Sequence, residues 1–182
     1  MGIILDLCGG TGSWSKPYSD AGYEVINVTL PDTDVRTYKP PKGVIGILAA
    51  PPCTMFSLAR TRAKTPRDFK EGMECVTACL NIVWQCRYEG DLKFWALENP
   101  MGYLRQFLGI PRYTFEPHYF GDLYTKKTDL WGYFRLPKRT TFWGLYKLKS
   151  MSEIARSARK RAITPIGFAK AFYKANNPLK KY

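Results

Sequence analysis

Short apolar runs bounded by glycine or proline alternate along this chain with stretches that have the 3.6-residue period of a helix. The runs that predict β-strands cover residues 3–7, 23–28, 44–49 and 93–97. The stretches that predict helices cover residues 14–22, 66–88 and 163–175. A further region, residues 114–133, is rich in strand-forming side chains and shows no long helix.

Strands that alternate with helices are joined by right-handed crossovers, which place neighbouring strands parallel. The sequence therefore predicts a Rossmann-like α/β fold with a mainly parallel sheet flanked by helices. Of the 182 residues, 45% are hydrophobic and 15% aromatic, which is enough for one buried core and argues against disorder. We expect a single domain over residues 1–182.

The same composition sets expectations about location and metals. No apolar run reaches the roughly 20 residues that cross a bilayer, so no membrane partner is expected. Residues 1–6 lack a basic leader, and Asp6 interrupts their apolar run, which indicates a first strand and not a signal peptide. Five cysteines without the spacing of a disulfide framework indicate reduced thiols in a cytoplasm. The single histidine, His118, argues against a His-dependent triad or a His-rich site, and no metal is predicted.

The net charge of +13 is confined to one part of the chain. Residues 1–125 hold 13 basic and 13 acidic residues, whereas residues 126–182 hold 15 basic and 2 acidic ones. The aromatic residues interleaved with this basic charge are Tyr124, Trp131, Tyr133, Phe134, Phe142, Trp143 and Tyr146. The pattern favours a neutral domain whose basic segment 126–182 binds nucleic acid, and a solvated basic surface is the alternative.

A glycine turn follows the first predicted strand and precedes a helix. In Cys8-Gly9-Gly10-Thr11-Gly12 the backbone can approach a ligand closely, and the following helix offers free N–H groups. The turn lacks the GxGxxG and GK[ST] patterns, which lowers the support for a dinucleotide or P-loop site. A cofactor site and a tight structural turn are both open at this point. Asp6, in the preceding strand, holds either a ligand amine or the turn itself.

The sharpest feature is Pro51-Pro52-Cys53, where two prolines fix the chain as the third strand ends. Ligands bind at the carboxyl edge of open α/β sheets, so a preorganised cysteine there is a candidate nucleophile. A buried, inert thiol is the alternative. Glu98 comes just past the fourth predicted strand at the same edge. Partial desolvation would raise its pKa and make it a proton donor near neutral pH, although a capping or exposed Glu is the commoner case.

Taken in order, these motifs resemble those of the DNA (cytosine-5) methyltransferases, in particular their compact phage-type members. The matching segments are Asp6-Leu7-Cys8-Gly9-Gly10-Thr11-Gly12, Pro51-Pro52-Cys53, Glu98-Asn99-Pro100, Tyr119-Phe120-Gly121-Asp122, Lys126-Lys127-Thr128-Asp129-Leu130-Trp131-Gly132 and Arg161-Ala162-Ile163-Thr164-Pro165-Ile166-Gly167-Phe168-Ala169. Each segment is short, but together they span about residues 3–175 in the family's order, which strongly favours Cys53 as the nucleophile.

The resemblance implies an S-adenosylmethionine-dependent methyltransferase fold and methyl transfer to C5 of cytosine in DNA. Cys53 would add to C6 as a thiolate, Glu98 would contact N3 and the exocyclic amine, and Asn99 would hold the turn. Lys126 stands in for the family's arginine pair, near the cytosine carbonyl or the Cys–Glu site, or else on a phosphate. The residues expected to bind S-adenosylmethionine are Asp6, Cys8, Gly9, Gly10, Gly12, Asp34, Val35, Pro51 and Thr164.

The chain also departs from the family pattern. Thr54 stands where the family has glutamine, and the second strand lacks the acid that binds the cofactor ribose, for which Asp32 is a distant substitute. The variable target-recognition domain is missing, since only residues 134–159 separate the last sheet motif from the final helix. RNA or a free cytosine nucleotide is therefore an alternative substrate, and a catalytically silent nucleic-acid-binding relative is the non-enzyme alternative.

Two further segments carry an expectation each. Residues 60–67 alternate basic and small side chains, which fits a mobile lid whose cations bind phosphates around an extruded base, or else a solvated loop. Cys75, Cys79 and Cys86 recur at helical intervals among apolar residues, which predicts core thiols in preference to a metal site.

Overall fold

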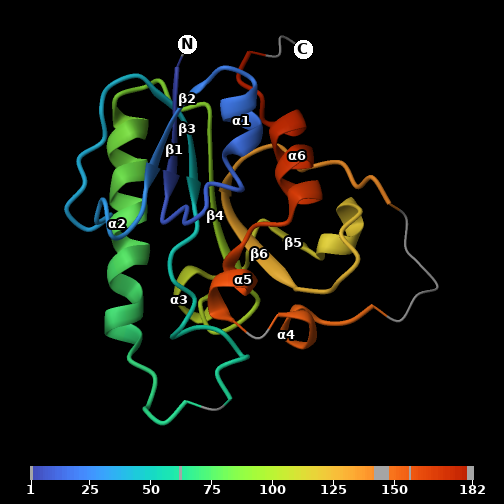
Figure 1. The fold of residues 1–182 in the computed structure, drawn as a ribbon. Coiled ribbons are helices and arrows are strands. Elements are labelled where there is room, and N and C mark those ends of the chain that lie inside the picture. The colour runs from blue at the N-terminus through green and yellow to red at the C-terminus, as the bar shows by residue number, and fades with distance from the viewer. Residues whose placement is uncertain (1, 62, 142–147, 156, 180–182) are drawn as a thin grey trace.

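The computed structural model describes residues 2–61, 63–141, 148–155 and 157–179 (Figure 1). A six-stranded sheet with the strand order β2-β1-β3-β4-β6-β5 forms its centre. The strands are β1 (Ile3–Leu7), β2 (Glu24–Val28), β3 (Val44–Ala49), β4 (Phe94–Pro100), β5 (Tyr113–Phe115) and β6 (Thr128–Tyr133). The helices are α1 (Lys16–Asp20), α2 (Phe69–Tyr88), α3 (Arg105–Leu108), the 3-10 helix η1 (Pro117–Phe120), α4 (Met151–Ile154), α5 (Ala158–Ala162) and α6 (Ile166–Ala175).

The sheet has a parallel half and an antiparallel half. β1 pairs in parallel with β2 and β3, and β3 pairs in parallel with β4, whereas β6 is antiparallel to both β4 and β5. The α/β class is confirmed and is compatible with a Rossmann-like fold, but the prediction of a mainly parallel sheet holds only for the first half. The reason lies in the connections. A parallel return needs a crossover of a dozen or more residues, usually a helix, and the helices that the structure describes in residues 101–127 are the short α3 and η1, on either side of β5.

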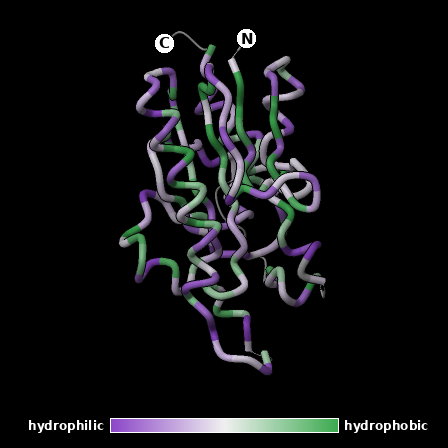
Figure 2. The backbone as a smooth tube through the Cα atoms, turned by 90° about the vertical axis from the view of Figure 1, so that its left-hand side faces the viewer, coloured by the Kyte–Doolittle hydropathy of each residue, from purple (hydrophilic) through white to green (hydrophobic). Residues whose placement is uncertain are grey.

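Helices cover both faces of the sheet (Figure 1). Side chains alternate along a strand, so Leu5 and Leu7 of β1 join the core under α2, while Ile4 joins the core under α1 and α6. The second core is aromatic, with Trp14 of the segment before α1 packed against Phe172 of α6 at 5.4 Å between ring centroids. Figure 2 shows the apolar residues running along the central strands. No helix within the described ranges is long and apolar enough to span a membrane.

Several predicted boundaries need correction. α2 begins at Phe69 because the carboxylate of Asp68 caps it, accepting a hydrogen bond from the Glu71 N–H at 2.9 Å. β4 does not end at residue 97 but continues to Pro100, since its antiparallel pairing with β6 extends that far. The last predicted helix starts at Ile166, and the separate short helix α5 precedes it.

The carboxyl ends of β1 to β4 meet at one edge of the sheet, which lies toward the bottom of Figure 1. β1 lies between β2 and β3, so the chain turns to opposite sides of β1 after its first two strands. Ligands of open α/β sheets bind at such a switch point, outside the carboxyl ends of the strands. The glycine turn after β1 and the Pro-Pro-Cys loop after β3 both start there.

Candidate active site

Three polar side chains from separate segments meet at the carboxyl edge of the sheet. Cys53 follows β3, Glu98 lies within β4, and Lys126 directly precedes the turn into β6. The Lys126 Nζ lies 3.8 Å from the Glu98 Oε1, and only 13% and 14% of these two side chains are exposed. Cys53 is half-buried, and the charges of Glu98 and Lys126 both shift the pKa of its thiol. The structure therefore brings together the predicted nucleophile, the predicted acid and the predicted lysine.

Asn99 joins the Cys53 loop to β4. Its buried amide Nδ2 donates a hydrogen bond to the Pro51 carbonyl at 3.0 Å, one strand away. Asn99 also pairs with Asp129 in the β4–β6 ladder, so the Glu98-Asn99-Pro100 motif is part of a strand and does not form the turn expected from the sequence. The loop that carries Cys53 is thus fixed to the strand that carries Glu98.

The Lys126 backbone is held by a carboxylate that follows the neighbouring strand β5. Glu116, which follows β5, accepts a hydrogen bond from the Lys126 N–H through Oε2 at 2.8 Å. The Thr128 hydroxyl donates to the Lys126 carbonyl at 2.7 Å. These bonds hold the main chain on both sides of Lys126, so its ammonium group extends over Glu98 from a fixed base.

Burial sets the protonation of the site. It raises the pKa of Glu98, an effect that the neighbouring Lys126 opposes and Asp129 reinforces. Burial likewise raises the pKa of the Cys53 thiol, Glu98 raises it further, and Lys126 and Arg161 lower it. Arg161, in α5, was not predicted as a site residue; its Nη1 donates to the Ala155 carbonyl at 3.1 Å. Glu98 is thus a carboxyl that keeps its proton more readily than an ordinary glutamate.

The glycine turn is built around a buried carboxyl group. Asp6 is fully buried, and its Oδ2 accepts a hydrogen bond from the Ser15 hydroxyl at 2.5 Å, whereas Oδ1 has no hydrogen-bond partner among the residues that the structure describes. Burial raises the pKa of Asp6 to about 6, against the lowering effect of Ser15. A Cβ atom at Gly9 would overlap the Asp6 carboxyl group, so the turn closes over Asp6 only with glycine there. Asp6 supports the turn from beneath and does not lie on its outer surface.

The outer side of the glycine turn is open. Cys8, Gly10 and Gly12 have positive φ values of 57°, 55° and 70°, a conformation that is costly for Cys8. Space around Gly10 is free, with no atom of the described residues within 4 Å of a Cβ placed there. The Gly10 N–H lies 3.3 Å from the Thr29 hydroxyl, and the Asn27 amide donates to the Gly10 carbonyl at 3.1 Å. The backbone is thus shaped, supported and accessible at this position.

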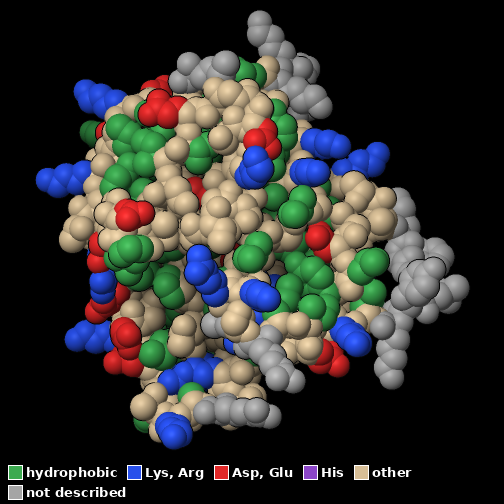
Figure 3. Space-filling view, in the orientation of Figure 1, with side chains coloured by type: hydrophobic (Ala, Val, Ile, Leu, Met, Phe, Trp, Pro, Cys, Tyr) green, Lys and Arg blue, Asp and Glu red, His purple; other side chains and the backbone are tan. Residues whose placement is uncertain are grey.

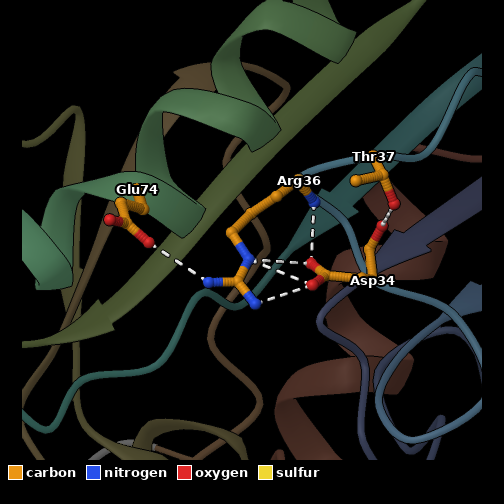
Figure 4. A network of polar contacts seen from close by, with 4 residues as sticks. All are labelled: Asp34, Arg36, Thr37 and Glu74. Atoms are coloured by element: carbon orange, nitrogen blue, oxygen red, sulfur yellow. Dashed lines mark hydrogen bonds and ion pairs between the residues drawn. The ribbon is translucent and has the colours of Figure 1, made fainter.

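Asp34 is engaged by a neighbour on its own loop (Figure 4). The Arg36 guanidinium contacts both Asp34 oxygens, the closest at 2.7 Å, and also reaches Glu74 of α2 at 3.1 Å. This contact lowers the pKa of the Asp34 carboxyl, and the adjoining Val35 is buried in the core. A ligand that used Asp34 would share its carboxylate with Arg36. Asp32, the distant substitute for the ribose-binding acid, is exposed.

The two remaining predicted cofactor residues lie on opposite sides of the switch point. Pro51 is buried directly before the Cys53 loop, and Thr164 is half-buried in the link between α5 and α6. The start of α6 packs beside the glycine-turn segment, since Phe168 lies 5.8 Å from Trp14 between ring centroids. Thr164 therefore lies four residues before the Phe168 that packs on the α1 side of the sheet.

The core thiols are confirmed, with one addition. Cys79 and Cys86 are buried in the core under α2, and Cys75 is partly buried against it. The Cys79 thiol interacts with Cys8 of the glycine turn, and this interaction lowers the pKa of Cys8. In the part of the chain that the structure describes, no group of three or more His, Cys, Asp or Glu side chains could hold a metal ion.

In the segment 60–67, the two arginines described are bonded to the protein itself. Arg60 donates to the Thr65 carbonyl and hydroxyl, each at 2.9 Å, and Arg67 donates to the Met55 and Ser57 carbonyls. The lid and the solvated loop both stay predictions. Arg62 lies outside the described residues.

Sequence reasoning also missed a half-buried ion pair beside the site. Arg105 of α3 donates two hydrogen bonds of 2.6 Å to Asp129, which is fully buried in β6 and also accepts from the Thr114 hydroxyl at 2.7 Å. A single acid inside an otherwise apolar strand was the available indication, because a buried carboxylate requires a partner. The network holds β5 and α3 against the end of β4.

On the face drawn in Figure 3, the basic side chains of the described residues are spread out, including over its lower part. α5 places Arg159, Lys160 and Arg161 near the carboxyl edge, and Arg139 lies over the Tyr119 ring at 3.9 Å. Phe142, Trp143 and Tyr146 of the basic segment 126–182 lie outside the described residues, as do its residues 144, 145, 147, 156 and 180–182.

Two cavities lie away from Cys53, Glu98 and Lys126. One of about 600 Å³ lies between the outer side of α2 and the segment of Val35, an expected cofactor residue, and Tyr38. The other, of about 370 Å³, lies at the start of β4 beside Trp95 and Tyr133. The cluster of Cys53, Glu98 and Lys126 is therefore defined by converging polar groups and not by either cavity. No model of a known protein family matches the chain, and a comparison with curated proteins likewise finds no match.

Proposed function

We propose that this protein is an S-adenosylmethionine-dependent methyltransferase that acts on C5 of cytosine in DNA, with Cys53 as the nucleophile. The observation that carries the proposal is the meeting of Cys53, Glu98 and Lys126 at the carboxyl edge, with Lys126 3.8 Å from Glu98. A thiol, a carboxyl group of raised pKa and an ammonium group are the groups that C5 methylation of a pyrimidine requires.

The chemistry assigns a task to each residue. C5 of cytosine is a weak nucleophile while the ring is aromatic. Addition of the Cys53 thiolate forms an Sγ–C6 bond, and the electrons of the C5=C6 bond move into the ring as N3 takes up a proton. C5 can then accept a methyl group. Loss of the C5 proton to a base, with departure of the thiolate and return of the N3 proton, restores the aromatic ring and frees Cys53.

Glu98 is placed to supply the N3 proton. Burial keeps its carboxyl group protonated to higher pH than usual, and Lys126 limits that effect, so that the pKa is raised but still opposed by a cation. Lys126 and Arg161 act on Cys53 in the opposite sense to burial, favouring the thiolate that adds to C6. Burial keeps both Glu98 and Cys53 protonated, which favours the acid but disfavours the thiolate. Lys126 and Arg161 partly offset this effect at Cys53.

The glycine turn fits the expected cofactor on two observations. Gly9 is required by the close approach of Asp6, and the space at Gly10 is open at the switch point of the sheet. S-adenosylmethionine, when bound, supplies an electrophilic methyl group. The residues that would hold it are the turn of Cys8, Gly9, Gly10 and Gly12, supported by Asp6, together with Asp34, Val35, Pro51 and Thr164. The Asp34–Arg36 contact is the feature that fits least well.

Basic residues near the site support a nucleic-acid substrate. α5 carries three consecutive cations at the carboxyl edge, and Lys126 and Lys127 precede β6 beside Glu98. Cations bind phosphates without reading sequence, and a base must leave the helix to reach Cys53. DNA is the proposed substrate, and RNA and dCMP are the competing ones that the experiment separates.

The test measures transfer of labelled methyl from S-adenosylmethionine to duplex DNA, single-stranded DNA, RNA and dCMP in parallel. We expect label in DNA, and a covalent complex with DNA that carries 5-fluorocytosine, because fluorine cannot leave C5 as a proton does. The complex should survive denaturing electrophoresis, require cofactor, persist in Cys86→Ala and disappear in Cys53→Ala. An adduct that persists in Cys53→Ala refutes the assignment of the nucleophile. Label in none of the four substrates refutes the proposed activity.

A further inference from the structure

Arg67 turns away from solvent and toward the loop that carries Cys53. It stands directly before the Asp68 cap of α2, yet its Nη1 donates to the Met55 carbonyl at 2.8 Å and its Nη2 to the Ser57 carbonyl at 2.9 Å. Met55 and Ser57 are the second and fourth residues after Cys53. The planar guanidinium thus spans the turn that follows the thiol.

The carbonyl between these two is held from the segment after Glu98. The Tyr103 N–H donates to the Phe56 carbonyl at 2.9 Å, and Ser57 forms a bridge with Gly102. A Cβ atom at Gly102 would overlap the Phe56 carbonyl, so this approach requires glycine. The Tyr103 ring also lies 4.8 Å from the Arg67 guanidinium carbon, in the range of a cation–π contact.

Three successive carbonyls after Cys53 are therefore bound, two by Arg67 and one by Tyr103. The Cys53 carbonyl itself accepts hydrogen bonds from the Phe56 and Ser57 N–H groups at 3.0 and 2.8 Å. Every main-chain acceptor from Met55 to Ser57 is directed inward. The turn after Cys53 is therefore bonded both to Arg67 and to the segment that follows Glu98.

We propose that Arg67 is a positioning residue that fixes the Cys53 loop against the segment following Glu98. The expected effect on the reaction rests on the proposed function, whereas the positioning of the loop rests on the hydrogen bonds of Arg67. Reacting groups displaced by about 1 Å can lose on the order of 10²-fold in rate, so a loop fixed at three carbonyls has direct value for a nucleophile. Lysine cannot replace the fork, because a single ammonium does not present two parallel donors.

A phosphate-binding role for Arg67 makes opposite predictions. An arginine that binds a DNA phosphate contributes to affinity, and its removal lowers the slope of log affinity against log salt by about one. An arginine that holds the loop leaves this slope unchanged and alters the behaviour of Cys53. Arg60 provides the matched control, since it makes two similar guanidinium bonds, but to Thr65 and not to the Cys53 loop.

The experiment compares Arg67→Ala, Arg67→Lys and Arg60→Ala with the unmutated protein. The rate of alkylation by iodoacetamide is followed at each cysteine by peptide mass spectrometry, alongside kcat, KM and the salt slope of DNA binding. In both Arg67 variants we expect alkylation of Cys53 to rise roughly threefold or more, because the half-buried thiol is released by local opening, while Cys79 and Cys86 keep their rates. We expect kcat to fall by about 10- to 100-fold with KM and the salt slope unchanged. Arg60→Ala should leave the alkylation rate of Cys53 unchanged, because Arg60 does not bind the Cys53 loop through its side chain.

Each other outcome overturns the proposal. Unchanged Cys53 reactivity with a lower salt slope assigns Arg67 to a phosphate, and normal behaviour of Arg67→Lys means that charge alone suffices. A parallel rise in alkylation at Cys79 and Cys86 shows global unfolding of the Arg67 variants. Tyr103→Leu, which retains the backbone bond to Phe56, then serves as the second variant. If its Cys53 alkylation rate equals that of the unmutated protein, the proposal is likewise overturned. The alkylation assay needs no substrate. If the unmutated protein methylates nothing, the proposed function fails while the role of Arg67 is still decided by Cys53.

Discussion

The two loops at the switch point are neighbours, yet they are held in different ways. The first follows β1 and the second follows β3, and the Ala50 N–H donates to the Leu7 carbonyl at 2.9 Å between them. The glycine turn takes its shape from its own backbone, with three positive φ values over the buried Asp6. The Cys53 loop takes its shape from distant side chains, Arg67 and Asn99, and from the Tyr103 backbone.

This difference separates what each loop can offer. The glycine turn is supported from below by Asp6, and its Gly10 N–H and carbonyl are bound by Thr29 and Asn27. The space beside Gly10 is open, which leaves room for a ligand to approach the backbone closely. In the Cys53 loop, the carbonyls from Met55 to Ser57 are bound within the protein. One loop thus leaves space beside its backbone, whereas the other has its backbone bound after the Cys53 thiol.

The largest effect should come from Glu98→Gln, which tests the thiol side of the comparison. Removing a general acid typically costs about 10²–10⁴-fold in rate, with binding retained. Because the pKa of Glu98 is raised, the single-turnover rate of the unmutated protein should fall as pH rises through that pKa, and the variant should lack this alkaline limb. Rates measured from pH 5 to 9 check this. A limb that persists in Glu98→Gln would assign the acid to another group.

Next comes Asp6→Asn, which tests the support under the glycine turn. The pKa of Asp6 is about 6 in the fold and 3.8 when exposed, so the fold favours the protonated carboxyl group. Its contribution is present below about pH 4 and is lost as pH rises to about 6, which amounts to up to about 3 kcal/mol. Urea unfolding at pH 4 and pH 7 should show a smaller decline in the free energy of unfolding for Asp6→Asn than for the unmutated protein. Identical declines in the two proteins would contradict the burial of an ionisable carboxyl group here.

The smallest effect distinguishes two adjacent glycines of the same turn. Gly9→Ala should destabilise the fold by about 1–3 kcal/mol, because its Cβ overlaps the Asp6 carboxyl group. Gly10→Ala meets open space and should cost about 1 kcal/mol, through its positive φ alone. Urea unfolding gives the stability, and calorimetry with S-adenosylhomocysteine tests binding, which Gly9→Ala should weaken more. The reverse order in stability would mean that the turn is not built on Asp6.

The sequence predicted the local elements better than the pairing between them. β1 and β3 match their predicted bounds because each is a buried apolar run between turn residues. The end of β4 was wrong, because its last three residues are strand only through pairing with β6, some 30 residues away. α5 was missed because Arg159, Lys160 and Arg161 give it no apolar stripe.

The same division applies to the site. Cys53 and Glu98 were predicted because each was expected just past a strand, and parallel topology brings such ends together. Lys126 was predicted from the resemblance alone, and the antiparallel pairing of β6 with β4 brings it to the same edge. The bonds of Arg67 to the Cys53 loop were not predicted. Its partners are main-chain carbonyls, which every residue has, so the sequence does not indicate them. Asp34 shows the converse case, in which a motif residue was found but its ion pair with Arg36 was not.

The contact between α6 and the start of the chain has a consequence for the order of folding. The Tyr18 hydroxyl donates to the Asn176 carbonyl at 3.4 Å, and the Tyr23 hydroxyl donates to the Asn177 amide oxygen at 2.5 Å, across more than 150 residues. At about 5–20 residues per second, a ribosome needs roughly 10–30 s to make that interval. During this time Trp14, beside the glycine turn, lacks its aromatic packing partners Phe168 and Phe172, which have not yet been synthesised. We therefore expect the nascent chain to complete the Cys53 loop before α6 closes the opposite face of the sheet.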